Sequence, residues 1–148
     1  MHKVIKSVAV IAAAALTLTA CSSGGASTPS ASSTAPKIKI GMAYDVGGRG
    51  DQSFNDSAAA GLDKAAQEFG VDTKEAAATN GEAESAREER LNQLIDAGYN
   101  NIVAVGFAYA TAVKAVAAEN PDVKFAIVDD SSITADNVMN LTFAANEG

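Results

Sequence analysis

Residues 101–128 read NIVAVGFAYATAVKAVAAENPDVKFAIV, and their pattern decides the fold class. Two short runs of apolar and β-branched residues, at 101–105 and 124–128, are typical of buried strands. Between these runs, the apolar residues of 108–119 recur at helical spacing, and Asn120-Pro121 ends the helix. A strand, a helix and a second strand in so short a stretch predict a parallel βαβ unit.

The same alternation continues on both sides of this unit. The further elements that we expect are strands at 37–44, 71–76 and 137–143, and helices at 55–69 and 82–97. Gly70 and Gly98 follow the two helices, where a left-handed residue commonly ends a helix. Right-handed crossovers between such elements predict an α/β lobe with a parallel sheet and helices on both faces. Residues 37–148 suffice for one three-layer lobe and not for two.

The N-terminal segment, residues 1–20, is expected to be a signal peptide. Lys3 and Lys6 precede an apolar run at 8–18, which is too short to span a bilayer by itself. Leu18-Thr19-Ala20-Cys21 resembles the bacterial lipobox. That resemblance implies that Cys21 becomes the lipid-bearing N-terminus of the mature protein. The lipid would anchor the protein at the extracytoplasmic face of the cell membrane.

The stretch from Cys21 to Pro36 is expected to be the lipidated Cys followed by a flexible tether. After Cys21 it contains only Ser, Thr, Gly, Pro and Ala, and it carries no charge. Such a segment has too little apolar surface to offset the entropy that ordering would cost. The predicted order along the chain is therefore signal peptide, lipidated Cys and tether, and then a folded lobe at 37–148.

Charge and composition exclude several classes of function. The net charge is −7, which argues against nucleic acid as a partner because phosphate recognition needs clustered Lys and Arg. Removal of residues 1–20 leaves 9 of the 11 basic residues against 18 acidic ones, a net charge of −9. It also removes His2, the single His, while Cys21 becomes a thioether. Histidine-based catalysis, His/Cys metal sites and a Cys nucleophile are then unavailable. We expect no enzyme, no cofactor and no metal.

Polar and aromatic side chains follow three of the predicted strands. Ligands of open parallel sheets bind beyond the carboxyl ends of the strands, where these loops converge. Carboxylates accept hydrogen bonds from hydroxyl groups, an amide both donates and accepts, and an aromatic ring offers a stacking face. The combination suits a neutral polyhydroxylated ligand with a flat ring. The candidates are Asp45, Phe54, Asn55, Gly106, Phe107, Asp129 and Asp130.

Simpler interpretations apply to each of these residues. Asp and Ser after a strand are common caps and turn formers, and Phe107 could belong to the core. The glycines of the loop at 45–54 fit neither a P-loop nor a dinucleotide fingerprint, which favours a tight turn. The charged run at 82–90 is expected to be a solvated helix face, with pairs such as Glu84–Arg87.

Three segments together resemble the basic membrane lipoprotein, or PnrA-like, family. They are IGMAYDVGGRGDQSFNDSAAAGL at 40–62, NIVAVGFAYATAV at 101–113 and NPDVKFAIVD at 120–129. Members of the family are substrate-binding lipoproteins of ABC importers. The resemblance implies a type I periplasmic-binding-protein fold, in which a purine nucleoside is closed between two lobes. It also implies an ABC permease as the partner in the membrane.

Residue roles follow from the same resemblance, position by position. Asp45 and Asn55 would form hydrogen bonds with the nucleoside, and Phe54 would stack on its base. Asp129 would bind the ribose hydroxyls. Gly106 and Phe107 would line the cleft.

The sequence departs from the family in length, because members are roughly twice as long. The second lobe is absent from this chain, so we expect the chain alone to bind nucleoside weakly or not measurably. Two other interpretations stay open. One is an Mg²⁺-dependent α/β enzyme built on acidic residues at 45, 51, 129 and 130, and the other is a surface interaction lipoprotein without a small ligand.

Overall fold

The computed structural model describes residues 37–147. The predicted signal peptide, Cys21 and the tether lie outside the described residues, and they stay predictions.

The described residues contain one parallel sheet with the strand order β2-β1-β3-β4-β5, and every neighbouring pair of strands is parallel. This order confirms the predicted α/β class, with β2 and β3 on opposite sides of β1. The strands are β1 (Lys39–Tyr44), β2 (Asp72–Ala77), β3 (Asn101–Val105), β4 (Lys124–Val128) and β5 (Val138–Leu141).

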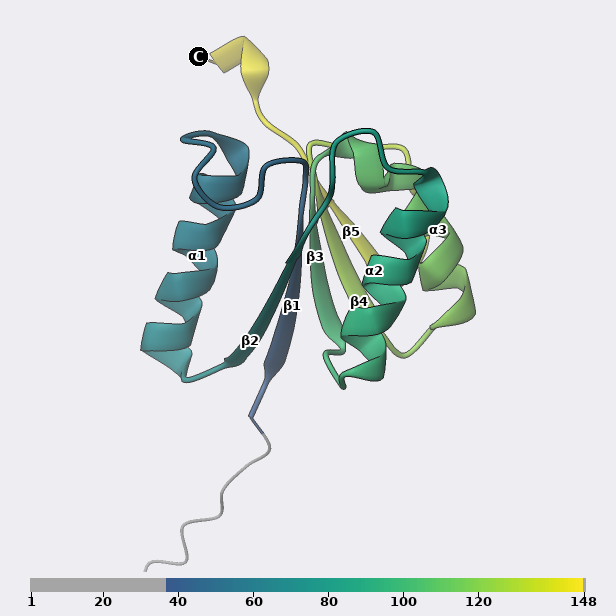
Figure 1. Ribbon diagram of the computed structural model, residues 1–148, viewed down its shortest axis with the longest axis horizontal. Coiled ribbons are helices and arrows are strands. Elements are labelled where there is room, and N and C mark those ends of the chain that lie inside the picture. The colour runs from purple at the N-terminus through teal and green to yellow at the C-terminus, as the bar shows by residue number, and fades with distance from the viewer. Residues whose placement is uncertain (1–36, 148) are drawn as a thin grey trace, which may run out of the picture. The chain divides into compact units, whose positions relative to one another are not determined.

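Helices cover both faces of the sheet, as a three-layer lobe requires (Figure 1). One face carries α1, and the other carries α2 and α3 (Figure 1). The helical elements are α1 (Phe54–Phe69), α2 (Glu84–Asp96), the short 3-10 turn η1 (Phe107–Tyr109), α3 (Ala110–Glu119) and the 3-10 turn η2 (Ala145–Glu147). Gly70 ends α1 with φ of 64° and donates its N–H to the carbonyl of Ala66, as predicted for a left-handed helix end.

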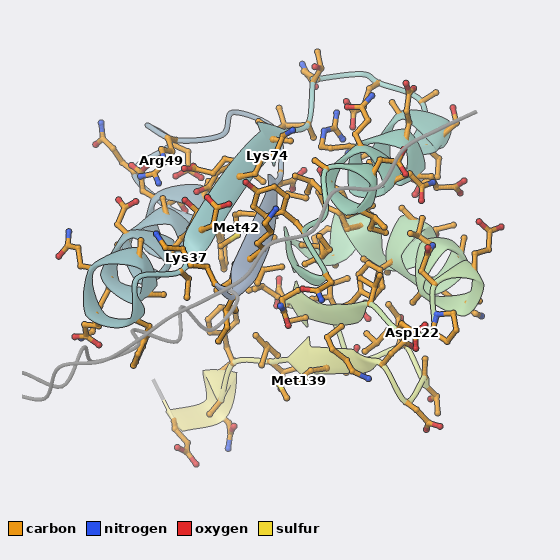
Figure 2. All side chains as sticks on the ribbon, turned by 90° about the horizontal axis from the view of Figure 1, so that it is seen from below. Lys37, Met42, Arg49, Lys74, Asp122 and Met139 are labelled. Atoms are coloured by element: carbon orange, nitrogen blue, oxygen red, sulfur yellow. The ribbon has the colours of Figure 1, made fainter. Side chains whose placement is uncertain are left out.

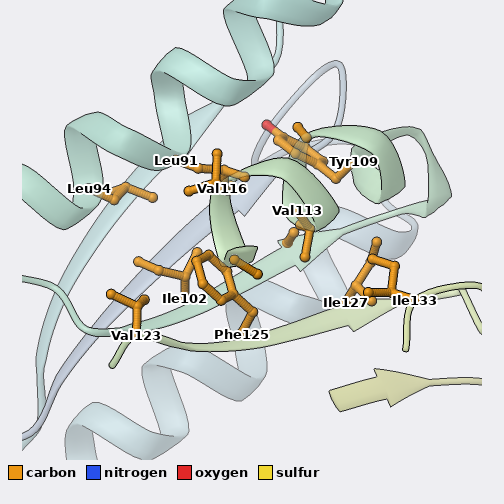
Figure 3. Packing of buried hydrophobic residues seen from close by; sticks show 14 residues of the cluster. Leu91, Leu94, Ile102, Tyr109, Val113, Val116, Val123, Phe125, Ile127 and Ile133 are labelled. Carbon is orange, nitrogen blue, oxygen red and sulfur yellow. The ribbon is translucent and has the colours of Figure 1, made fainter. Parts of the chain in front are cut away.

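The larger of two apolar cores lies between the sheet and the α2/α3 pair (Figure 3). Leu91 and Leu94 of α2 and Val113 of α3 are almost wholly buried against Ile102 and Ile127 of the sheet. A smaller core lies under α1 and contains Met42, Tyr44, Ala59, Leu62 and Val105. Burial of this kind contributes roughly 25 cal/mol per Å² of apolar surface, so these two cores hold the lobe together.

Two large apolar residues are exposed to solvent. Phe69 is the last residue of α1 and is 74% exposed, and Ile38 precedes β1 and is 60% exposed. Both sit at the ends of their elements, beyond the reach of the layer that would cover them. The helix predicted at 108–119 is also shorter than expected, because residues 107–109 form the tighter turn η1.

The α1 face of the sheet is covered unevenly. Met139 of the edge strand β5 is 63% exposed (Figure 2). Leu141 points to the same face of this strand, because side chains alternate along a strand, and it is 40% exposed. Shallow apolar hollows lie beside Ile40 and Val103, at the flank of α1.

Candidate functional site

Three of the predicted site residues follow directly after neighbouring strands. Asp45 follows β1, Gly106 follows β3 and Asp129 follows β4. The amide of Gly106 donates to the carbonyl of Val128 at 3.1 Å. A Cβ atom at Gly106 would lie 3.1 Å from Oδ2 of Asp45. The carboxyl ends of β1, β3 and β4 therefore form one continuous edge, as parallel strands require.

Asp45 is half-buried, and its two carboxylate oxygens have different surroundings. Oδ1 accepts the backbone N–H of Val46 at 2.8 Å. Oδ2 lies beside Gly106 and accepts no hydrogen bond from the residues that the structure describes. One oxygen of this carboxylate is thus free to accept a donor from outside the lobe.

Asn55 lies next to Asp45, but its amide is occupied within the protein. Its side chain is buried, and Oδ1 accepts the N–H of Asp45 at 3.1 Å. Its Nδ2 group contacts the carbonyls of Asp45 at 3.4 Å and Val46 at 3.3 Å. In this structure Asn55 therefore fastens the loop after β1 to the start of α1. Its role as a hydrogen-bonding partner of the ligand stays a prediction.

Asp51 in the loop and Asp56 in the first turn of α1 hold the loop in place through hydrogen bonds to its backbone. The Asp51 carboxylate accepts three backbone N–H groups, from Ser53, Asn55 and Asp56, at 2.9 to 3.0 Å. Burial alone would raise the pKa of Asp51, but these backbone donors outweigh it and lower that pKa. Asp56 in turn accepts the N–H groups of Gly50 and Gln52. The loop is thereby tied to the first turn of α1.

Arg49 joins the same loop to two other elements. Its guanidinium donates to both oxygens of Asp63 on α1, at 2.7 and 2.9 Å, and of Glu75 on β2, at 2.6 and 3.0 Å. The hydrogen bonds from Arg49 lower the pKa of both carboxyl groups. Glu75 also accepts the hydroxyl of Tyr44 at 2.7 Å, so this bridge reaches the last residue of β1.

Aromatic rings lie exposed around this edge. Phe54 is 51% exposed and Phe107 is 67% exposed, which excludes the interpretation of Phe107 as a core residue. The ring of Phe143 meets that of Phe54 edge to face, with centroids 5.6 Å apart. Together with Ser53 and Ser57, these two rings line a hollow of about 240 Å³. Phe143 was missed by the sequence analysis, because only the path of the chain after β5 brings it to α1.

Asp129 and Asp130 behave differently. Asp129 is exposed in a left-handed conformation with φ of 65°, and its carboxylate has no hydrogen-bond partner among the described residues. Oδ1 of Asp130 accepts both the N–H and the hydroxyl of Ser132, at 2.8 and 2.9 Å. The free carboxylate is thus the one that directly follows the strand.

The charged run at 82–90 is the expected solvated helix face only in part, because Glu84 and Glu89 are exposed and three other charged side chains are not. Glu82, Arg87 and Arg90 have side chains only 8%, 13% and 11% exposed. Arg90 donates to both oxygens of Glu82, at 2.6 and 2.9 Å, and to the hydroxyl of Tyr109 at 3.1 Å. The expected Glu84–Arg87 pair spans 3.9 Å, an ionic contact and not a hydrogen bond.

Tyr109 explains this difference between expectation and structure. Its side chain is wholly buried, and its hydroxyl donates to the carbonyl of Tyr44 at 3.1 Å while it accepts from Arg90. The guanidinium of Arg87 stacks over the same ring, 5.7 Å from the centroid. No local pattern of residues predicts that the phenol of Tyr109, from the turn after β3, lies beneath the charged face of α2.

The described residues give no support for a metal site. Among residues 37–147, no group of three or more His, Cys, Asp or Glu side chains could hold a metal ion. Within that range there is also no helix of the length and apolar character that crossing a bilayer demands.

Comparison with known proteins gives one family. The family model described as ABC transporter substrate-binding protein PnrA-like matches residues 37–148. A lipoprotein of Pyrococcus abyssi is 34% identical over 128 residues, which cover 86% of this chain and 30% of the relative.

Two solved structures extend the comparison to the fold. An ABC transporter solute-binding protein from Aeropyrum pernix is 38% identical with a TM-score of 0.62, over 70% of this chain and 28% of the other. A lipoprotein fragment from Peptoclostridium difficile is 25% identical with a TM-score of 0.64, over 75% of this chain and 89% of the other. The chain spans about a third or less of the length of the first curated relatives that it matches.

Proposed function

The chain belongs to the PnrA-like family of ABC transporter substrate-binding proteins, and on that basis we propose that it binds a purine nucleoside at the carboxyl edge of its sheet. An ABC permease would then accept the nucleoside for import. The family consists of substrate-binding proteins, and no catalytic step is part of the proposal.

One observation carries the choice of ligand: an exposed aromatic ring and free carboxylate oxygens lie along the same edge. Oδ2 of Asp45 and the carboxylate of Asp129 have no hydrogen-bond donor among the described residues, and Phe54 is half exposed. Carboxylates suit the hydroxyl groups of a ribose, and an exposed ring suits a planar base. Stacking of a base on an aromatic side chain is typically worth about 1–3 kcal/mol.

We assign a different role to each group of residues in the site. Asp45 and Asp129 would accept hydrogen bonds from the nucleoside, Phe54 would stack on the base, and Gly106 and Phe107 would line the cleft. Asn55 remains a proposed contact, although its present bonds to the loop backbone fit a supporting task better. The edge is open on one side, so a second lobe would have to close over the ligand.

The proposed location is the extracytoplasmic face of the membrane, with Cys21 as the lipid anchor after removal of residues 1–20, and residues 22–36 as the tether. The P. abyssi relative is named a lipoprotein, which supports this assignment. The mass of the protein extracted from membranes tests it directly. A mass without lipid on Cys21 would overturn the anchor.

Calorimetric titration tests the ligand class. Inosine, guanosine, adenosine and free ribose would be titrated into the receptor as the cell makes it. We expect purine nucleosides to bind and ribose alone to bind far more weakly. Phe54→Ala should weaken nucleoside binding at least fivefold, because it removes the stacking face.

Phe69→Ala is the matched control, since Phe69 is equally a phenylalanine of α1 but lies at the far end of that helix and is 74% exposed. It should leave the affinity unchanged. If Phe54→Ala stays within about threefold of the unsubstituted receptor, the stacking role is wrong. If no nucleoside binds at all, the surface interaction lipoprotein becomes the better interpretation.

A further inference from the structure

We infer that Arg87 of α2 is a positioning residue for the Asp45 carboxylate, and that it determines which oxygen of that carboxylate is offered to the ligand. The inference rests on the proposed function in one respect, namely that Asp45 contacts the ligand. It concerns a residue outside the segments that carry the family resemblance.

The contact itself is between the end of β1 and the second turn of α2. An Nη atom of Arg87 lies 3.9 Å from Oδ1 of Asp45. The side chain of Arg87 is 13% exposed while that of Asp45 is 38% exposed. The Arg87 side chain is therefore largely shielded from water, while the carboxylate that it faces stays partly open to it.

Arg87 is held in place by packing and not by hydrogen bonds. Its guanidinium stacks on the buried ring of Tyr109, and its Nε is buried without a hydrogen-bond partner among the described residues. Glu82 and Glu84 also lie 3.9 Å from it, outside hydrogen-bond range. A buried Nε–H group without a hydrogen-bond partner is costly, so its presence calls for an explanation.

The support beneath Arg87 is rigid and leads to the same strand end. The hydroxyl of Tyr109 bridges Arg90 and the carbonyl of Tyr44, each at 3.1 Å, and Glu82 holds Arg90 through two short hydrogen bonds. Tyr44 directly precedes Asp45. The ring that orients Arg87 is thus fixed to the backbone that carries the Asp45 carboxylate.

The two oxygens of the Asp45 carboxylate therefore have different roles. Oδ1 accepts the N–H of Val46 and faces Arg87, so both positive partners lie on one side of the carboxylate. Oδ2 lies beside Gly106, where a side chain would come within 3.1 Å of it. Arg87 therefore favours the rotamer in which Oδ2 faces the edge and is free for a ligand hydroxyl.

A double-mutant cycle on nucleoside affinity tests this, using the receptor as the cell makes it and inosine as the probe. Arg87→Gln should weaken binding about tenfold. In the Asp45→Asn background the same substitution should change the affinity less than about twofold, because no carboxylate remains to be positioned. Arg87→Lys should restore binding to within about threefold, since it keeps the charge. Glu89→Gln is the control on the same helix, since Glu89 is exposed and makes no ion pair among the described residues, and it should leave the affinity unchanged.

Equal losses from Arg87→Gln in both backgrounds would overturn the inference, since a merely structural role does not depend on Asp45. A crystal structure of Arg87→Gln without ligand gives an answer that needs no binding. A rotated Asp45 carboxylate supports the inference, and an unchanged rotamer contradicts it. If the unsubstituted receptor binds no nucleoside, the proposed function fails while this structural outcome still decides the role of Arg87.

Discussion

At the scale of single residues, side chains of the same type at one sheet edge have different roles. Their hydrogen bonds distinguish those that support a turn from those that are available to a ligand. Asp130 uses its carboxylate to close a turn with Ser132, whereas Asp129 accepts nothing from the described residues. The side-chain amide of Asn55 forms hydrogen bonds through both its oxygen and its nitrogen with the backbone of the loop after β1. Residue identity alone therefore does not distinguish a ligand contact from a support.

Asn55→Ala should destabilise the protein by about 1 kcal/mol, because it removes three part-buried hydrogen bonds to the backbone of Asp45 and Val46. Urea denaturation measures this loss as a lower midpoint with an unchanged slope. Gln67→Ala is a suitable control, since Gln67 lies exposed on the same helix. Equal midpoints for the two variants would show that the amide of Asn55 does not hold the loop.

Asp129→Asn should weaken nucleoside binding about tenfold while it changes the free energy of unfolding by less than about 0.5 kcal/mol. Asn adopts the left-handed conformation of this position without strain, so the substitution removes the charge alone. Asp130→Asn provides the contrast, because its side-chain oxygen still accepts the hydrogen bonds of the turn. Calorimetric titration should therefore find normal binding in that variant, and equal losses in both would refute the distinction.

At the scale of elements, the ion pairs of Arg49 and Arg90 join segments that are distant in the chain. Arg49 connects the loop after β1 to α1 and β2, and Arg90 connects the start of α2 to Tyr109 of η1. Arg49 lowers the pKa of Asp63 and Glu75, and Arg90 does the same for Glu82. These pairs make the packing of the elements sensitive to acid.

The free energy of unfolding should fall as the pH drops below the ordinary carboxyl range. A carboxyl whose pKa is lowered by folding stabilises the protein above its unfolded pKa, and that contribution is lost as the pH falls through its folded pKa. The unfolded values are 4.5 for Glu75 and Glu82 and 3.8 for Asp63, so the loss begins near the glutamate value and continues below it. Urea denaturation at a series of pH values measures it.

Arg90→Gln should make the free energy of unfolding less dependent on pH in this range, because it removes the cation that lowers the pKa of Glu82. Lys114→Gln is the control, since Lys114 is exposed on α3 and makes no ion pair among the described residues. A pH dependence as steep in Arg90→Gln as in the unsubstituted protein would contradict the role of this pair.

The elements themselves could be predicted because their signals are local. The apolar runs at 101–105 and 124–128 became β3 and β4 with the predicted bounds, and Gly70 ends α1 as expected. The burial of the charged run at 82–90 could not be predicted, because it depends on where Tyr109 lies in three dimensions. The contact between Phe54 and Phe143 depends in the same way on the path of the chain after β5.

At the scale of the whole molecule, the described residues form one lobe, and its polar edge can contact a ligand from one side only. The carboxyl ends of the strands carry exposed aromatic rings and carboxylate oxygens that have no hydrogen-bond donor among the described residues. The relatives matched first are about three or more times as long as the part that aligns. Residues 37–148 by themselves should therefore bind inosine at least about a hundredfold more weakly than a receptor with two lobes, which parallel titrations would measure.

Hydrogen–deuterium exchange with and without saturating inosine tests the central claim most directly, because it reports where on the receptor the ligand acts. The account predicts slower exchange in the segments 45–55, 106–109 and 129–132, which make up the edge. Exchange in 110–119 of α3 should stay the same. Inosine that saturates the receptor yet leaves the three edge segments unprotected would contradict the proposal that this edge is the binding site.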